Sequence, residues 1–125
     1  MRTSLVLIDV DRFKLINDTL GHAAGDRYLG LVAQVLRQKI RNLDVVGRLG
    51  GDEFLVILPM TSATESLVFI NRLQSGLQEL AVQHTAFAMS TLSFGIAEAP
   101  RHGKTPTALM AAADSALYAA KRGGR

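Results

Sequence analysis

Residues 44–58 read DVVGRLGGDEFLVIL, and in this stretch two apolar runs flank a pair of glycines. The runs, residues 44–49 and 53–58, are short and rich in valine, leucine and isoleucine, as β-strands are. Gly50-Gly51 supplies the positive φ angles that a two-residue hairpin needs. We therefore predict an antiparallel hairpin here, whose second strand ends at Pro59.

Strands and helices alternate outward from this hairpin. Residues 3–10 form an apolar run that ends in acid, which predicts a buried strand. Residues 87–97 predict another strand, with Gly95 as a bulge or a point of close approach.

Four helices complete the pattern, each marked by its own start or stop signals. They are residues 13–20, closed by Gly21; residues 24–40; residues 62–83, opened by the Ser62/Glu65 capping box; and a helix from Thr105-Pro106 to about 122, stopped by Gly123. The order β-α-α-β-β-α-β-α predicts an α+β domain, in which helices flank a central mixed sheet that contains a β-hairpin.

Composition narrows the class of protein. The 125 residues suit one domain, residues 1–125, and a 48% apolar fraction excludes a disordered chain. The absence of cysteine excludes disulfides, thiolate zinc sites and cysteine nucleophiles. The net charge of +3 is too small to predict a nucleic-acid partner, and no apolar run is long enough for a membrane span. We expect a cytoplasmic domain without membrane contact.

Two acidic clusters are candidates for metal binding. Asp9-Val10-Asp11 ends the first strand, and its carboxylates suit Mg²⁺ or Mn²⁺. Asp9 is equally well explained as a solvated strand end, and for Asp11 we favour capping of the next helix. Asp52-Glu53 follows the glycine pair, where two carboxylates need a cation unless they belong to an ordinary acidic turn.

Lys121 and Arg125 lie four residues apart around the end of the last helix, with Arg122 between them. Such cations converge on a triphosphate or complement the negative end of the helix dipole.

Four segments of the chain, taken in order, resemble the motifs of one family, the GGDEF domains of diguanylate cyclases. They are DVDRFKLINDTLGHAAGDRYL at residues 9–29, RLGGDEF at 48–54, SFGIA at 93–97 and ADSALYAAKRGGR at 113–125. Together they cover nearly the whole chain, which makes the resemblance specific.

The resemblance implies a palm-like sheet that condenses two GTP molecules into cyclic di-GMP and pyrophosphate, with Mg²⁺ or Mn²⁺ as cofactor. It implies metal binding by Asp9, the Val10 carbonyl, Asp52 and Glu53. Asp52 and Glu53 are the implied catalytic residues, and Asp52 either positions metal or accepts the proton of the attacking 3′-hydroxyl.

The implied substrate-binding residues fall into three groups. Asn17 and Asp26 face the guanine edge. Gly50 and Gly51 lie against the nucleotide, and Lys121 and Arg125 bind the triphosphate. Phe13 is also implied at the substrate, outside these groups. A carboxylate accepts hydrogen bonds from N1–H and the exocyclic amine of guanine, which adenine does not offer in that arrangement.

Arg41-Asn-Leu-Asp44 stands at the spacing of the family's inhibitory Arg-x-x-Asp motif, and Arg72 matches a secondary arginine of that site. The resemblance implies that these residues bind cyclic di-GMP and that this binding inhibits its synthesis. The alternative is a solvated arginine at a helix end and a solvated aspartate at a strand start.

Relatives extend beyond both ends of this sequence, so we expect a domain trimmed at both ends, with a sensor domain in the parent protein. The product joins two nucleotides, so we expect a homodimer in catalysis. The alternative function is a non-catalytic module of the same family that binds GTP or cyclic di-GMP. The intact Asp52-Glu53 pair favours the enzyme.

Overall fold

The computed structural model describes residues 2–83 and 91–123, and its elements follow the predicted order. They are β1 (Thr3–Val10), α1 (Phe13–Leu20), α2 (His22–Lys39), β2 (Val45–Arg48), β3 (Glu53–Pro59), α3 (Ala63–Gln83), β4 (Leu92–Ala99) and α4 (Pro106–Arg122). The α+β class is confirmed. Within the described residues the last strand covers Leu92–Ala99 and ends later than predicted, and the part of that prediction at residues 87–90 lies outside the described residues.

The four strands form one sheet in the order β2-β3-β1-β4, and every neighbouring pair is antiparallel. The prediction of a mixed sheet is therefore wrong in this respect. Each helical crossover does join two strands that run in the same direction, but another strand lies between them: β3 separates β1 from β2, and β1 separates β3 from β4. This is the split β-α-β arrangement.

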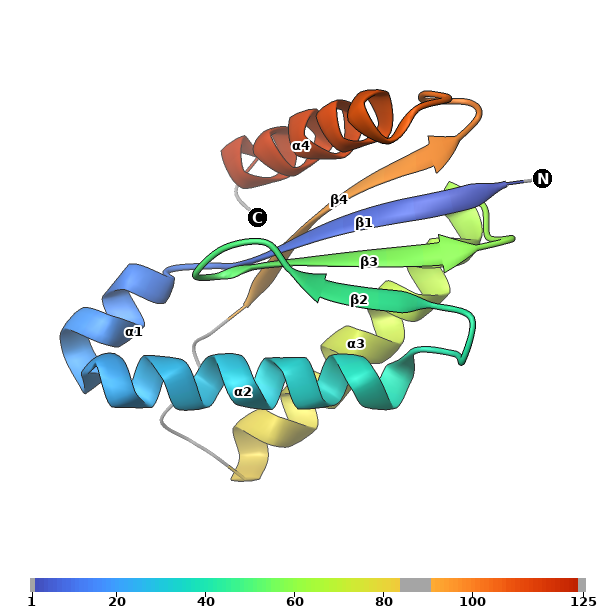
Figure 1. Ribbon diagram of the computed structural model, residues 1–125. Coiled ribbons are helices and arrows are strands. Elements are labelled where there is room, and N and C mark those ends of the chain that lie inside the picture. Colours follow the sequence, from blue (N-terminus) through green and yellow to red (C-terminus); the bar gives the residue numbers. More distant parts are fainter. Residues whose placement is uncertain (1, 84–90, 124–125) are drawn as a thin grey trace.

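The sheet is the middle of three layers: α2 and α3 cover one face, and α4 covers the other (Figure 1). Strand β1 is buried on both faces, which explains its continuous apolar sequence. Val6, Ile8 and Val10 point into the larger core, under α2 and α3, whereas Leu5 and Leu7 face α4. Alternate residues of β1 thus hold the two helical layers together.

Gly95 lets α4 lie directly on the sheet. A Cβ at this position would overlap the carbonyl oxygen of Ala113 and lie 2.6 Å from the amide nitrogen of Leu117. Both atoms are backbone, so no side-chain rotation relieves the contact. The predicted close approach at Gly95 is confirmed.

Local signals fix the starts of two helices as predicted. Ser62 Oγ accepts a hydrogen bond from the Glu65 amide at 3.0 Å, and Glu65 Oε1 accepts one from the Ser62 amide at 2.8 Å, which is a capping box. The Thr105 hydroxyl accepts from the Ala108 amide at 3.1 Å at the start of α4. Among the described residues, no helix combines the length and apolarity that crossing a bilayer requires.

Candidate functional site

The polar end of the sheet gathers the elements that carry most of the predicted residues. The C-terminal end of β1, the tip of the β2–β3 hairpin, the start of α1 and the end of α4 all lie at the same edge (Figure 1). In the register of the sheet, Asp9 on β1 stands opposite Glu53 on β3 and opposite Ser93 on β4. An acidic side chain from each of two adjacent strands is thereby brought to one edge.

A cavity of about 380 Å³ opens between this edge and α4. Its lining residues are Asp9 and Glu53 from the sheet and Asp114, Ser115, Leu117, Tyr118 and Lys121 from α4. The structure therefore brings together three of the predicted residues: Asp9, Glu53 and Lys121. Carboxylates facing a cation across a cavity form an environment suited to a metal–phosphate group.

Asp9 is the most constrained of these side chains. It is only 5% exposed, and its Oδ2 forms an ion pair with Lys121 Nζ. Its Oδ1 is buried and has no hydrogen-bond partner among the described residues. Burying a carboxylate oxygen without a partner is costly, so this atom is suited to receive a cation.

Asp52 is connected to Asp9 through the backbone rather than through the cavity. Its carbonyl accepts a hydrogen bond from the Val10 amide at 3.1 Å, and its side chain is half-buried beside the cavity lining rather than part of it. Within the described ranges, 2–83 and 91–123, no three acidic or histidine side chains converge as a ready-made metal cluster. A metal at this edge would therefore depend on few carboxylates, as Mg²⁺ sites that also use substrate phosphates do.

The hairpin turn differs from its prediction. Neither Gly50 nor Gly51 has a positive φ, and Leu49 donates its amide to Glu53 O at 2.9 Å, so the turn is longer than two residues. The Arg48 guanidinium holds the turn by donating to Gly50 O at 3.1 Å and to Gly51 O at 2.6 Å. A Cβ on either glycine would meet no protein atom within 4 Å. The packing of the fold therefore does not require glycine at either position, and the backbone here is open to close approach from outside.

The prediction that Asp11 caps the next helix is wrong. Its carboxylate instead accepts hydrogen bonds from the Thr91 and Ser93 hydroxyls, each at 2.6 Å, and it is only 4% exposed. Helix α1 begins after Arg12, which has a left-handed backbone with φ 57° and makes no side-chain cap. The capping prediction failed because the true partners of Asp11 are 80 and 82 residues away in the sequence.

Asn17 lies on α1 and is packed against α2. A Cβ at Gly25 would overlap Asn17 Oδ1, and would lie 3.0 Å from its Cγ and 3.2 Å from Phe13 Cζ. Asn17 Oδ1 is buried without a hydrogen-bond partner among the described residues. Asp26 is exposed on α2, so its carboxylate is not a buried group. Arg125 lies outside the described residues.

Sequence reasoning named only Lys121 from the part of the cavity wall that α4 supplies, and it overlooked the other lining residues of that helix. Asp114, Tyr118 and Lys121 follow one another at four and three residues, the spacing of a single helix face, and that periodicity was available as a signal. Tyr118 is 62% exposed, accepts a hydrogen bond from Arg122 at 3.2 Å and stacks under its guanidinium at 5.6 Å.

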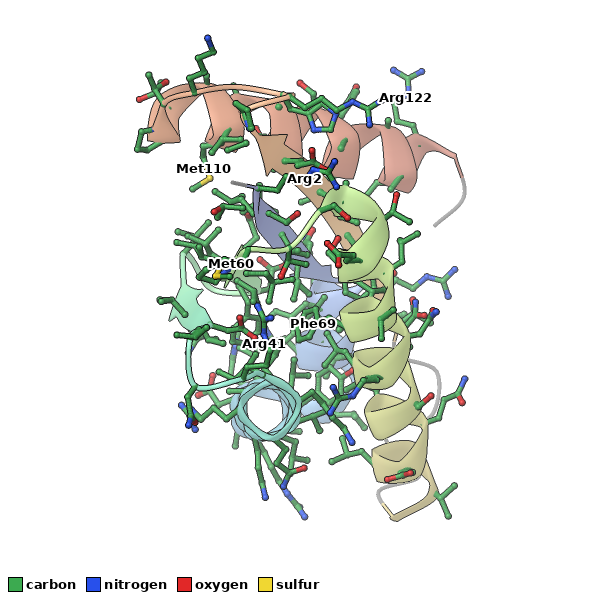
Figure 2. The ribbon with its side chains drawn as sticks, turned by 90° about the vertical axis from the view of Figure 1, so that its right-hand side faces the viewer. Arg2, Arg41, Met60, Phe69, Met110 and Arg122 are labelled. Atoms are coloured by element: carbon green, nitrogen blue, oxygen red, sulfur yellow. The ribbon has the colours of Figure 1, made fainter. Side chains whose placement is uncertain are left out.

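A second pocket, of about 200 Å³, lies at the opposite end of β3. Figure 2 shows Arg41, Met60 and Phe69 close together there, between the end of α2, the β3–α3 turn and α3. Its lining also includes Asp44 and Arg72, so the structure brings the three predicted inhibitory-site residues into one pocket.

Arg41 is held firmly in this pocket. Its guanidinium donates to both Asp44 oxygens, at 2.8 to 3.2 Å, and also to Pro59 O at 2.9 Å and Thr61 Oγ1 at 3.0 Å. The hydrogen bonds to Asp44 raise the pKa of Arg41 above its ordinary value. The arginine therefore stays charged, and Arg72 adds a second guanidinium to the lining.

The sequence matches the family described as "Diguanylate cyclase, GGDEF domain" over residues 1–125. It is 43% identical to the diguanylate cyclase TpbB of Pseudomonas aeruginosa over 124 residues, and this alignment covers 98% of this chain and 28% of that protein. It is 38% identical over 125 residues to the response regulator PleD of Caulobacter vibrioides, covering 98% of this chain and 28% of that protein. The chain thus spans less than a third of the length of these curated relatives.

Solved structures of GGDEF domains match the fold of this chain. The crystal structure of the GGDEF domain of TpbB matches with a TM-score of 0.86 and 40% identity, covering 98% of this chain and 77% of that one. The GGDEF domain of DgcB from Caulobacter crescentus, solved in complex with c-di-GMP, matches with a TM-score of 0.82 and 34% identity, covering 99% of this chain and 74% of that one.

Proposed function

Because the chain belongs to the GGDEF-domain family, we propose that it is the catalytic domain of a diguanylate cyclase, which condenses two GTP molecules into cyclic di-GMP. In each of two transfers, a ribose 3′-oxygen bonds to the α-phosphorus of the other nucleotide and pyrophosphate leaves. The observation that carries this proposal is the cross-strand pair of Asp9 and Glu53, which shares one cavity with Lys121.

The donor set fits a divalent metal, Mg²⁺ or Mn²⁺. Asp9 Oδ1 is a buried carboxylate oxygen without a hydrogen bond among the described residues, and Glu53 lines the same cavity. We assign the metal to Asp9 and Glu53, with the Val10 carbonyl and Asp52 as further ligands. When bound, such a metal neutralises phosphate charge and lowers the pKa of a coordinated hydroxyl.

Side chains around the cavity have separate roles in this proposal. Lys121 binds the triphosphate and has to leave Asp9, at least in part, to do so. Arg125 is proposed as its helper on sequence grounds. The proton of the attacking hydroxyl passes to Asp52 or Glu53.

The nucleoside end is proposed to rest on α1 and α2. Asn17 offers a buried amide oxygen to the guanine edge, and the exposed Asp26 accepts hydrogen bonds from N1–H and the exocyclic amine. Phe13 lies against the same Gly25 surface as Asn17. The open space at Gly50 and Gly51 admits the nucleotide next to the hairpin.

Catalysis in this proposal needs two domains, each with one nucleotide, related by two-fold symmetry. The rate per domain should therefore rise with protein concentration until the dimer is saturated. A rate that does not change with dilution would contradict this encounter.

We also propose that Arg41, Asp44 and Arg72 bind the product. Two guanidinium groups in one pocket suit the two phosphates of cyclic di-GMP, and the pocket lies at the far end of β3 from Glu53. A relative with this fold, the GGDEF domain of DgcB, was solved in complex with c-di-GMP, which supports this choice of ligand.

The direct test is incubation with GTP and Mg²⁺, followed by chromatographic separation of the nucleotides. Asp9→Asn and Glu53→Gln should abolish product while the domain stays folded. Glu79→Gln, an exposed change on α3, is the matched control and should leave turnover intact. A wild-type domain that binds GTP tightly but forms no product at high protein concentration would favour the non-catalytic module.

A further inference from the structure

The Asp11 carboxylate is a buried polar group that the proposed mechanism does not use. It follows β1 directly, one residue after the Val10 carbonyl and two after Asp9. It is 4% exposed, and it accepts hydrogen bonds from Thr91 Oγ1 and Ser93 Oγ, each at 2.6 Å. Its own amide donates to Thr91 O at 2.9 Å. Both its backbone and its side chain therefore attach the exit of β1 to the beginning of β4.

The same turn determines where α1 starts. Arg12, next in the chain, has a left-handed backbone and makes no side-chain cap to the helix. No residue of α1 is fully buried, so the helix has only partly buried contacts to hold its direction. The fixed point at its N-terminus is consequently the turn that Asp11 anchors.

The two halves of the proposed substrate site meet at this turn. Asp9 and Val10 precede it, and Asn17 follows on α1. The Val10 amide is bonded to Asp52 O, so the hairpin is attached to the same point. A change in the turn would alter the separation between the metal end and the guanine end of a bound nucleotide.

We propose that Asp11 is a positioning residue: held by the Thr91 and Ser93 hydroxyls, it sets the placement of the Asp9–Val10 metal end relative to the helix that carries Asn17. This inference rests on the proposed function for the identity of the ligand. Asp11 itself touches neither metal nor nucleotide in this proposal. Groups in such supporting positions typically change metal affinity or activity by about 10- to 100-fold when removed.

The test measures Mn²⁺ affinity by electron paramagnetic resonance in the presence of α,β-methylene GTP, which cannot release pyrophosphate. Asp11→Ala should weaken Mn²⁺ binding by about tenfold or more. Asp11→Asn should stay within about threefold of the wild type, because its amide still accepts from one hydroxyl and donates to the other.

Ser4→Ala is the matched control for stability. It removes another buried hydroxyl bond of β1, from Ser4 Oγ to Thr61 O at 2.8 Å, at the opposite end of the strand. It should lower the melting temperature without changing Mn²⁺ affinity. If Asp11→Ala does not fold, Ser93→Ala and Thr91→Val, each removing one hydroxyl, should weaken Mn²⁺ binding in its place.

Wild-type Mn²⁺ affinity in a folded Asp11→Ala variant, or in both hydroxyl variants, would overturn the proposal. An equal loss of Mn²⁺ affinity in Ser4→Ala would also overturn the proposal, because the loss would then follow the general stability of the domain. Since the probe does not react, a domain that binds it but makes no cyclic di-GMP would refute the proposed function and leave the positioning role supported.

Discussion

Gly25→Ala should separate nucleotide binding from stability. Position 25 lies within α2 and its φ is not positive, so alanine fits the backbone. The added methyl group would overlap Asn17 Oδ1, which is the end of a flexible side chain rather than backbone. Asn17 should therefore rotate away from its buried position while the helix remains intact.

The two expected effects have opposite signs. Replacing glycine by alanine inside a helix stabilises it by up to about 1 kcal/mol, or about 4 °C in melting temperature for a domain of this size. Loss of one Asn17 hydrogen bond to guanine costs about 1 kcal/mol, which raises the Kd for GTP roughly fivefold. The affinity for ATP should change little, so the preference for GTP shrinks by the same factor.

Calorimetric titration with GTP and ATP, combined with thermal unfolding, measures both effects. Gly30→Ala on the same helix is the control, because a Cβ there meets nothing within 4 Å. It should raise the melting temperature and leave both affinities unchanged. Wild-type GTP affinity in Gly25→Ala would refute the assignment of Asn17 to the guanine edge, and a large loss of stability would show that the overlap is not relieved by the side chain.

Three further outcomes are expected. Gly95→Ala should lower the free energy of unfolding in urea by about 1–3 kcal/mol, because the methyl group meets backbone of α4, whereas Gly47→Ala, in open space on β2, should have far less effect. Arg72→Ala should weaken cyclic di-GMP binding at least tenfold in calorimetry while the initial rate without product is kept; unchanged product affinity would remove this residue from the inhibitory pocket. Hydrogen bonds from the Ser62 amide and hydroxyl lower the pKa of Glu65 below 4.5. The contribution of Glu65 to the stability of the folded domain is therefore present above that value and is lost as pH falls through the lowered pKa. The stability difference between wild type and Glu65→Ala should accordingly be seen at pH 7 and vanish in acid, and a difference that persists in acid would contradict this origin.

Features that depend on neighbours in the sequence were predictable. The strand at residues 3–10, the capping box at Ser62 and the start of α4 rest on apolar runs and cap residues a few positions apart, and the structure contains all three. The ion pair of Arg41 with Asp44 is equally local, three residues apart, but the sequence analysis did not predict it. Short-range preferences are expressed in the fold when nothing distant competes with them.

Features that depend on distant partners were not predictable. Asp11 has the pattern of a helix cap, but its carboxylate instead accepts hydrogen bonds from the Thr91 hydroxyl, just before β4, and from the Ser93 hydroxyl on β4. Gly50-Gly51 suggested a two-residue turn, but the Arg48 side chain binds its carbonyls and stabilises a longer one. The mixed sheet was inferred from the helical crossovers, which do not reveal that another strand enters between the two they join.

The two faces of the sheet carry cores of unequal size, and this has a consequence for local opening. In the described part of the chain, α4 alone covers one face (Figure 1), and its buried cluster is small: Leu5, Leu7, Ala97, Ala113 and Leu117. An element with few buried apolar side chains opens at a lower free energy than the rest of a domain. Amide protons of α4 should therefore exchange with solvent before those of β1. An opening of α4 would withdraw Lys121 from Asp9 and remove one wall of the cavity, so the cavity requires the last helix to be docked.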